Sequence, residues 1–241
     1  ERRAWTMTER GRARLHAGAT ALAIGPSALD WRGDALTVRI DEVTVPLPSR
    51  VRGTVRVHPQ LRTEHVFALD AAGRHRWRPI APRARVEVDF ERPVLRWQGT
   101  GYLDSNDGDA PLEDDFRYWT WSRNSQRDGS TTVLYDVARR DGGATSLALR
   151  FNGRADPEPI DAAPRIELKR SGWRIDRITR SDDGARVARA LEDAPFYARS
   201  LVETTLLGEP VLAMHEALDL DRFRRRWVQA LLPFRMPRRA G

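Results

Sequence analysis

The 241-residue chain contains no cysteine. This absence excludes disulfides, thiolate catalysis, and zinc or iron–sulfur sites with thiolate ligands, and it fits a cytoplasmic protein. Lysine is nearly absent as well, because Lys169 stands alone against 40 arginines. Any site chemistry must therefore come mainly from carboxylates, imidazoles, hydroxyls, guanidinium groups and aromatic rings.

Long apolar runs are also missing, although 40% of the residues are hydrophobic. No stretch approaches the roughly 20 apolar residues that a membrane-spanning helix needs. The first residues, ERRAWTMTERGRARLH, lack the apolar core of a signal peptide. The net charge of +7 would suggest an anionic partner. The near-total replacement of lysine by arginine, however, is more typical of GC-rich coding than of a nucleic-acid-binding surface. No nucleic-acid-binding motif is recognisable either, so we expect no nucleic-acid partner.

Apolar and polar residues alternate over much of the chain, notably in residues 36–40, 51–57 and 84–90. Such alternation is typical of antiparallel strands with one buried face. Two hairpins are predicted, within residues 133–151 and 201–218, with turns at Asp141-Gly142-Gly143 and Gly208-Glu209-Pro210. No βαβ rhythm, phosphate-binding glycine loop or repeat is present. The fold is therefore predicted to be mainly β, an antiparallel barrel or sandwich.

A helix is predicted near the C-terminus. Asp219 can cap it, and a single apolar face would then contain Leu220, Phe223, Trp227 and Leu231. The opposite face and the tail PFRMPRRAG are rich in arginine. Two interpretations stay open: the helix packs on the β-structure with a solvated arginine face, or it lies in a membrane interface as a peripheral anchor.

A domain seam is predicted at RWRPIAPRAR, because Pro79 and Pro82 interrupt the alternation just before a new strand. It separates a basic, valine-rich first third from a more aromatic remainder. The expected division is an N-terminal β-domain of residues 1–80 and a C-terminal β-domain of residues 81–241 that carries the helix.

Residues 99–123, GTGYLDSNDGDAPLEDDFRYWTWSR, combine six acids with a dense aromatic block. The part DSNDGD resembles the beginning of a calcium-binding loop. That loop requires its glycine at the sixth position, whereas Gly108 is fifth here. The sequence therefore predicts no metal site.

Two pairs of residues at two-residue spacing carry the candidate chemistry. Tyr102 and Asp104 share a face of an extended chain, and so do His75 and Trp77. If the first pair lines an aromatic pocket, burial favours the protonated form of Asp104, which can then act as a general acid. The alternative is structural: Tyr102 is core, Asp104 bonds backbone amides in a turn, and His75 is a satisfied buried histidine.

The remaining acids of the segment lie further into the loop. They are expected to be solvated or structural: Asp107, Asp109, Glu113, Asp114 and Asp115.

These segments together resemble the carotenoid 1,2-hydratase (hydroxyneurosporene synthase) family of phototrophic bacteria. The specific matches are GYLDSNDGDAPLEDDFRYWTWSR and LLPFRMPR. Weaker matches such as IGPSALDWRGDALTVRIDEVTVPLP and FYARSLVETTLLGEPVLAMHEALDLDRF extend the resemblance over nearly the whole chain. Family members usually begin some tens of residues earlier, so the resemblance implies that an N-terminal segment is missing here.

The resemblance implies a lipocalin-like fold of two β-domains with a pocket near their junction. It also implies a hydro-lyase that adds water, without a cofactor, across the terminal C1=C2 bond of acyclic carotenes such as neurosporene and lycopene. The family's essential residues match His75, Trp77, Tyr102 and Asp104.

In the mechanism that follows, Asp104 protonates C2, and Trp77 and Tyr102 hold the tertiary cation at C1 against their ring faces. Water then attacks C1. His75 either takes the proton of that water or sets the protonation state of Asp104. Trp119 and Trp121 are expected to line the substrate pocket, with an ordinary core role as the alternative.

The carotene substrate lives in the bilayer, so we expect peripheral association with the cytoplasmic side of a membrane. Two other functions remain open at this point. One is a non-catalytic lipocalin-like protein that binds an apolar polyene or lipid; the other is a cation-driven cyclase on the same scaffold.

Overall fold

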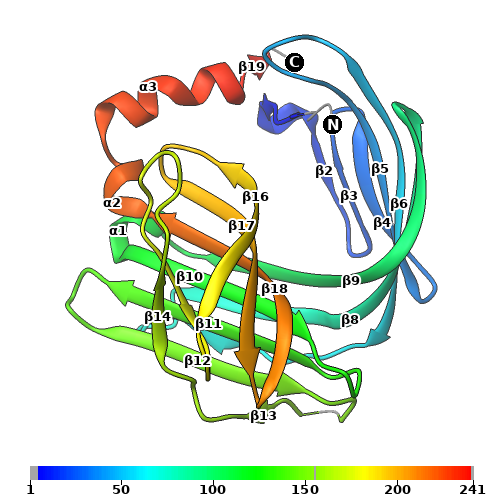
Figure 1. Ribbon diagram of the computed structural model, residues 1–241. Helices are drawn as coiled ribbons and strands as arrows, with labels where there is room; N and C mark the ends of the chain where they lie inside the picture. The colour runs from blue at the N-terminus through cyan, green and yellow to red at the C-terminus, as the bar shows by residue number, and fades with distance from the viewer. Residues whose placement is uncertain (1–4, 155, 240–241) are drawn as a thin grey trace. The chain divides into compact units, whose positions relative to one another are not determined.

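The computed structural model describes residues 5–154 and 156–239, and over these residues the chain is mainly β (Figure 1). The strands form antiparallel sheets, and helices lie near the C-terminus, which confirms the predicted fold class. Among the described residues neither large sheet closes into a barrel. The chain divides into two compact units, which are described separately below.

The first unit comprises the described parts of residues 1–62, 83–103 and 229–241. Its main sheet is an antiparallel meander in the order β2-β3-β4-β5-β6-β8. Their bounds are β2 Leu15–Ala17, β3 Ala21–Ile24, β4 Ser27–Arg32, β5 Ala35–Val43, β6 Arg50–Leu61 and β8 His75–Arg92, and β9 Val94–Gly108 pairs with β8. A short 3-10 turn, η1, covers Arg12–Arg14, and β1 Glu9–Arg10 pairs in parallel with β19 Arg238–Arg239.

The second unit comprises the described parts of residues 63–82 and 104–228. Its large antiparallel sheet has the order β13-β12-β11-β10-β18-β17-β16. The bounds are β10 Phe116–Ser125, β11 Thr131–Arg139, β12 Ala144–Phe151, β13 Glu158–Pro159, β16 Ala185–Asp193, β17 Tyr197–Leu206 and β18 Glu209–Asp219. The unit also holds β7 Phe67–Ala68, the helical turn α1 Leu112–Asp115, and a pair formed by β14 Arg165–Leu168 and β15 Arg177–Arg180.

Both predicted hairpins are present. Strands β11 and β12 pair with Tyr135 opposite Leu147, which buries the alternating apolar face. Strands β17 and β18 are joined by Leu207 and Gly208, whose φ angles of 56° and 74° suit a tight two-residue hairpin turn. The second turn therefore lies one residue earlier than the sequence predicted, and Pro210 already belongs to β18.

Strand β8 passes through both prolines without a break, so Pro79 and Pro82 do not end a strand. Pairing with β6 stops at Arg83 and pairing with β7 involves only Arg76 and Trp77. The prolines thus lie where one ladder has ended and the other has not begun, a position that tolerates a residue without an N–H. Ala81 and Pro82 are both buried, so the buried face shifts by one residue there.

The two units interleave along the chain, which passes between them after residues 62, 82, 103 and 228. The predicted boundary at residue 80 lies close to the second of these points. Each unit is nevertheless assembled from separate segments. Two domains that fold independently as residues 1–80 and 81–241 therefore stay a prediction.

The predicted C-terminal helix is present in two pieces, α2 Leu220–Phe223 and α3 Arg226–Arg235. Asp219 caps α2 as expected, because its carboxylate accepts a 2.8 Å hydrogen bond from the backbone N–H of Arg222. A turn at Arg224 and Arg225 separates α2 from α3, although Arg224 itself keeps α-helical backbone angles. The expectation of one continuous helix is therefore wrong.

The break also changes which side chains of α3 are buried. Val228 is fully buried, whereas Trp227 and Leu231 are 42% and 39% exposed and Phe234 is 72% exposed. The predicted apolar face is therefore only partly buried, since Leu220 is in the core whereas Trp227 and Leu231 are open to solvent. Residues 240–241 of the predicted basic tail lie outside the described residues. No helix in the described part of the chain has both the length and the apolarity needed to cross a bilayer.

His215 on β18 gives the fold a testable pH dependence. It is fully buried, its Nε2 lies 2.9 Å from the carbonyl oxygen of Ile178, and burial lowers its pKa to about 4. In the unfolded chain the pKa of a histidine is about 6.5, so between these values the unfolded state binds more protons. The free energy of unfolding should therefore fall as the pH drops through this window.

We expect His215→Gln to remove roughly 2 to 3 kcal/mol of the loss in unfolding free energy between pH 7.5 and 4.5. Urea unfolding at the two pH values measures this. The exposed His16 gives a matched control, His16→Gln, which should keep the full pH dependence. An unchanged slope in His215→Gln would show that His215 does not titrate in this way.

Candidate functional site

The turn before β8 fixes the start of the candidate site. The carboxylate of Asp70 accepts hydrogen bonds from the backbone N–H groups of Ala72, Arg74 and His75. Burial alone would raise the pKa of Asp70, but these three donors outweigh it and lower the pKa. Gly73 completes the turn with a φ of 67°. His75 is thereby placed as the first residue of the strand.

Strand β8 then turns His75 and Trp77 inward, while Arg76 between them is only half-buried. The exposed fractions of His75 and Trp77 are 1% and 0%. The indole N–H of Trp77 donates a 2.8 Å hydrogen bond to Oδ2 of Asp104 on β9. The structure therefore brings together three of the four residues singled out by their spacing.

Aromatic rings surround this strand end within the second unit. The ring of Trp77 lies 5.4 Å from Phe67 and meets Tyr135 edge-on at 5.7 Å, and Tyr135 meets Trp119 edge-on at 6.0 Å. We call the following touching rings the aromatic cluster: Phe67, His75, Trp77, Phe116, Trp119 and Tyr135.

Tyr135 is a member of the site that sequence reasoning missed. Its side chain is buried, and its hydroxyl donates a 3.3 Å hydrogen bond to Oδ1 of Asn106. Burial raises the pKa of Tyr135, and the negative charges of Asp104 and Glu216 raise it further, so the phenol stays neutral. In the sequence Tyr135 is one apolar position of a predicted strand. Only the pairing of β10 with β11 shows that it faces the cluster.

His75 does not bond to Asp104. Its Nε2 lies 2.7 Å from Oδ2 of Asp115, the last residue of α1, and no hydrogen bond reaches its Nδ1. Asp115 also accepts a hydrogen bond from Arg74, and its side chain is only 16% exposed. Asp115 is therefore not a solvated loop acid, and it is the second residue that sequence reasoning missed.

Asp107 and Asp109 lie further along the acidic segment and are paired with arginines. Arg76 bonds both carboxylates, and Arg78 bonds Asp107 as well. These hydrogen bonds lower the pKa of both acids below the ordinary value. Both carboxylates are thus ionised and neutralised by protein cations. Within the described ranges, no three histidine, aspartate or glutamate side chains are grouped so that they could hold a metal ion.

Tyr102 and Trp121 lie on strands β9 and β10, respectively. Tyr102 is half-buried on β9, two residues before Asp104, in the stretch that belongs to the first unit. Trp121 is half-buried on β10 and pairs with Tyr135 and Glu216 on the neighbouring strands, so it shares their side of the sheet. Substrate contact by Trp119 and Trp121 and catalysis by Tyr102 stay predictions.

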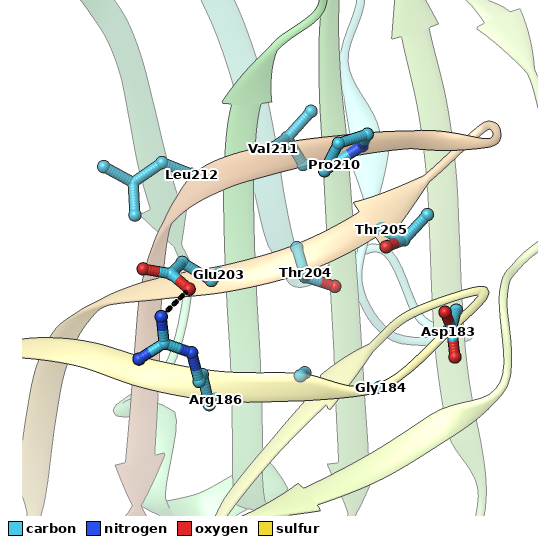
Figure 2. A pocket seen from close by; sticks show the side chains of 10 residues that line it. Asp183, Gly184, Arg186, Glu203, Thr204, Thr205, Pro210, Val211 and Leu212 are labelled. Carbon is cyan, nitrogen blue, oxygen red and sulfur yellow. Dashed lines mark ion pairs between the residues drawn. The ribbon is translucent and has the colours of Figure 1, made fainter.

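Two of the hollows in the described part of the second unit are candidates for a functional site. The smaller, about 120 Å³, lies beside the aromatic cluster and is lined by His75, Asn106 and Gly108 together with Leu69, Arg76, Asp107, Ala110 and Leu112. The larger, about 590 Å³, is an open groove along β16, β17 and β18 (Figure 2). Its lining includes an ion pair between Arg186 and Glu203. It shares no lining residue with the smaller hollow.

The fold is shared with a solved structure, a putative AttH from Nitrosomonas europaea. The TM-score is 0.58 at 14% sequence identity, and the match covers 86% of this chain and 71% of that one. This likeness supports the lipocalin-like fold alone.

The family described as carotenoid hydratase CrtC matches residues 1–241, so the chain belongs to that family, as the sequence indicated.

The chain is similar to several proteins named acyclic carotenoid 1,2-hydratase, among them the following three. The proteins of Thiocapsa roseopersicina, Rubrivivax gelatinosus and Cereibacter sphaeroides are 55%, 48% and 42% identical to this chain, each over 98% of it. The chain spans 59% of the length of the first two and 85% of the third.

The arginine pairing of the acidic segment predicts indifference to calcium. Addition of millimolar calcium should leave the melting temperature unchanged, because Asp107 and Asp109 already bond to arginines and would have to exchange them for the ion. Thermal melts with added calcium and with chelator measure this. A melting temperature that rises with calcium concentration and saturates would contradict the assignment.

Proposed function

We propose that the chain is a hydro-lyase that adds water, without a cofactor, to the terminal C1=C2 bond of acyclic carotenes such as neurosporene and lycopene. The product is a 1-hydroxy carotenoid. The observation that carries the proposal is the Trp77–Asp104 hydrogen bond inside an aromatic cluster, in a chain of the carotenoid hydratase family. The names of the relatives supply the substrate class.

In this proposal Asp104 is the proton donor. The indole N–H of Trp77 donates to Oδ2 and so orients the carboxyl group whose proton is proposed to go to C2. Protonation at C2 leaves a tertiary cation at C1, which aromatic ring faces can stabilise by roughly 0.5–2 kcal/mol each. Tyr102 is proposed to supply one such face. Because Trp77 is fully buried and directs its N–H to Asp104, its main role becomes that of orienting the acid.

Water then attacks C1 and must lose a proton. His75 is the proposed base, because its imidazole touches the cluster and does not bond to Asp104. Of its two roles considered from the sequence, the contacts of His75 favour this one. Carbon protonation and water deprotonation are thus assigned to separate groups.

Replacement of the donor tests the proposal. Asp104→Asn should lower the rate of 1-hydroxy carotene formation from lycopene by about 10²–10⁴-fold, the usual contribution of a positioned general acid. The assay uses detergent-dispersed lycopene in H₂¹⁸O, with products separated by chromatography and their label read by mass spectrometry. Circular dichroism and melting temperature check that the variant is folded.

Asp109→Asn is the matched control, because Asp109 is exposed and bonds only to Arg76 through its side chain. It should turn over normally. Near-normal turnover of Asp104→Asn would remove Asp104 from the mechanism. Carotene that copurifies unchanged, with no ¹⁸O incorporated by the wild type, would favour the non-catalytic binding protein instead.

We further propose that α3 contacts the cytoplasmic surface of the membrane that holds the substrate. The support is the exposure of Trp227, Leu231 and Phe234 on a helix whose start carries three exposed arginines, two just before it and Arg226 as its first residue. Apolar side chains would enter the interface while the arginines meet anionic headgroups.

Flotation with vesicles containing phosphatidylglycerol tests this contact. Phe234→Glu should reduce the bound fraction several-fold, because a carboxylate replaces a ring at the interface. Leu47→Glu, at an equally exposed apolar position outside the helix, should bind like the wild type. Equal binding of the two variants would exclude α3 as the contact.

A further inference from the structure

We propose that Asp115 is a positioning residue that fixes His75 in the tautomer with a free Nδ1, and that the small cavity beside this atom holds the water that is added. We define the water cavity as the hollow of about 120 Å³ lined by His75, Asn106 and Gly108. The inference rests on the proposed hydration. It adds roles for two further residues and a binding site for water, and the family resemblance supplies none of these.

The hydrogen bonds of Asp115 set the tautomer. A carboxylate bonded to the Arg74 guanidinium has only acceptor atoms to offer. At the 2.7 Å contact, Nε2 of His75 must therefore be the protonated nitrogen that donates to Asp115. A neutral imidazole protonated at Nε2 has its lone pair on Nδ1. Asp115 thus leaves His75 with one basic atom in a defined direction.

His75 is one of the residues that line the water cavity, and its Nδ1 is buried. The side chain of His75 is 1% exposed, and no group in the described part of the chain makes a hydrogen bond to its Nδ1. The backbone of Gly108 lies against it so closely that a Cβ at residue 108 would be 2.6 Å from Nδ1. Nδ1 is thus a buried acceptor that no protein group satisfies, and a water in the cavity that donated to it would satisfy it.

Asn106 supplies the second contact for that water. Its Oδ1 accepts the hydroxyl of Tyr135, so its amide N–H₂ is the group left to donate to a water oxygen. The side chain is exposed, so the cavity can refill from solvent. A water that donates to Nδ1 of His75 and accepts from Asn106 keeps a lone pair free for attack.

Strand geometry relates the water cavity to the acid. Asp104, Asn106 and Gly108 are alternate residues of β9, so they project on one side at intervals of roughly 6.5–7 Å. An alkene whose C2 faces Asp104 therefore presents C1 toward Asn106. The reaction needs this spacing, because the proton and the water add to adjacent carbons from separate groups.

The proton balance closes over one turnover. Asp104 gives its proton to C2, the C1=C2 bond breaks to a single bond, and the water oxygen forms the new bond to C1. The water gives one proton to Nδ1 of His75, and the imidazolium is stabilised by the carboxylate of Asp115. The proton then returns through solvent to Asp104, so the net change is substrate plus water.

The first test measures the tautomer directly. In protein labelled with ¹⁵N-histidine, long-range ¹H–¹⁵N correlation spectra should show His75 with an unprotonated Nδ1 and a protonated Nε2. Asp115→Asn should abolish this single tautomer, since an amide can either donate or accept. It should also lower kcat by about 10²–10⁴-fold with KM changed less than about threefold. The exposed neighbour provides the control Asp114→Asn, which should alter neither.

The second test closes the space beside Nδ1. Gly108→Ala should lower kcat at least tenfold while the tautomer of His75 stays as in the wild type, because Asp115 is untouched. Gly11→Ala, where a Cβ meets nothing within 4 Å, should be neutral. If Asp115→Asn does not fold, Gly108→Ala decides the outcome alone.

The results separate this inference from the proposed function. Full activity in both Asp115→Asn and Gly108→Ala, with Asp104→Asn inactive, would overturn the inference and leave hydration standing. A wild type that shows the predicted tautomer but makes no hydrated carotene would overturn hydration itself. Protonation of Nδ1 in the wild type would overturn the positioning role whatever the activity.

Discussion

The candidate site depends on the two-residue period of strands β8 and β9. On β8 this period turns His75 and Trp77 to one side, and on β9 it turns Asp104, Asn106 and Gly108 to one side. Each inward group of β8 then has its own polar neighbour, Asp115 for the imidazole and Asp104 for the indole. A slip of one residue in either strand would place Arg76 or Asp107 in the site instead.

Much of this arrangement could be read from the sequence. Alternation predicted the strands and both hairpins, and spacing singled out the residues that the structure places on one face. The misplaced glycine of the acidic segment argued against a calcium loop, and in the structure Asp107 and Asp109 of this segment bond to arginines. These features are local, so neighbouring residues were enough to predict them.

The missed features depend on contacts between distant residues. Asp115 meets His75 across 40 positions, and Tyr135 reaches the cluster only through the register of β10 and β11. No local pattern distinguishes Asp115 from Asp114. The break between α2 and α3 was missed for a different reason: the helical periodicity of the sequence continues through the turn at Arg224 and Arg225 that separates the two helices. Sequence alone fixed neither pairing nor this interruption.

The path of β8 and β9 through both units has a consequence for how such a protein can be altered. A gene fragment that ends near residue 80 would stop inside β8, five residues after His75, and would separate that strand from the stretch that pairs with β6. Exchange of parts between relatives would therefore have to move the β8–β9 hairpin as one block. Recombination within it would mix halves of a single pair of strands.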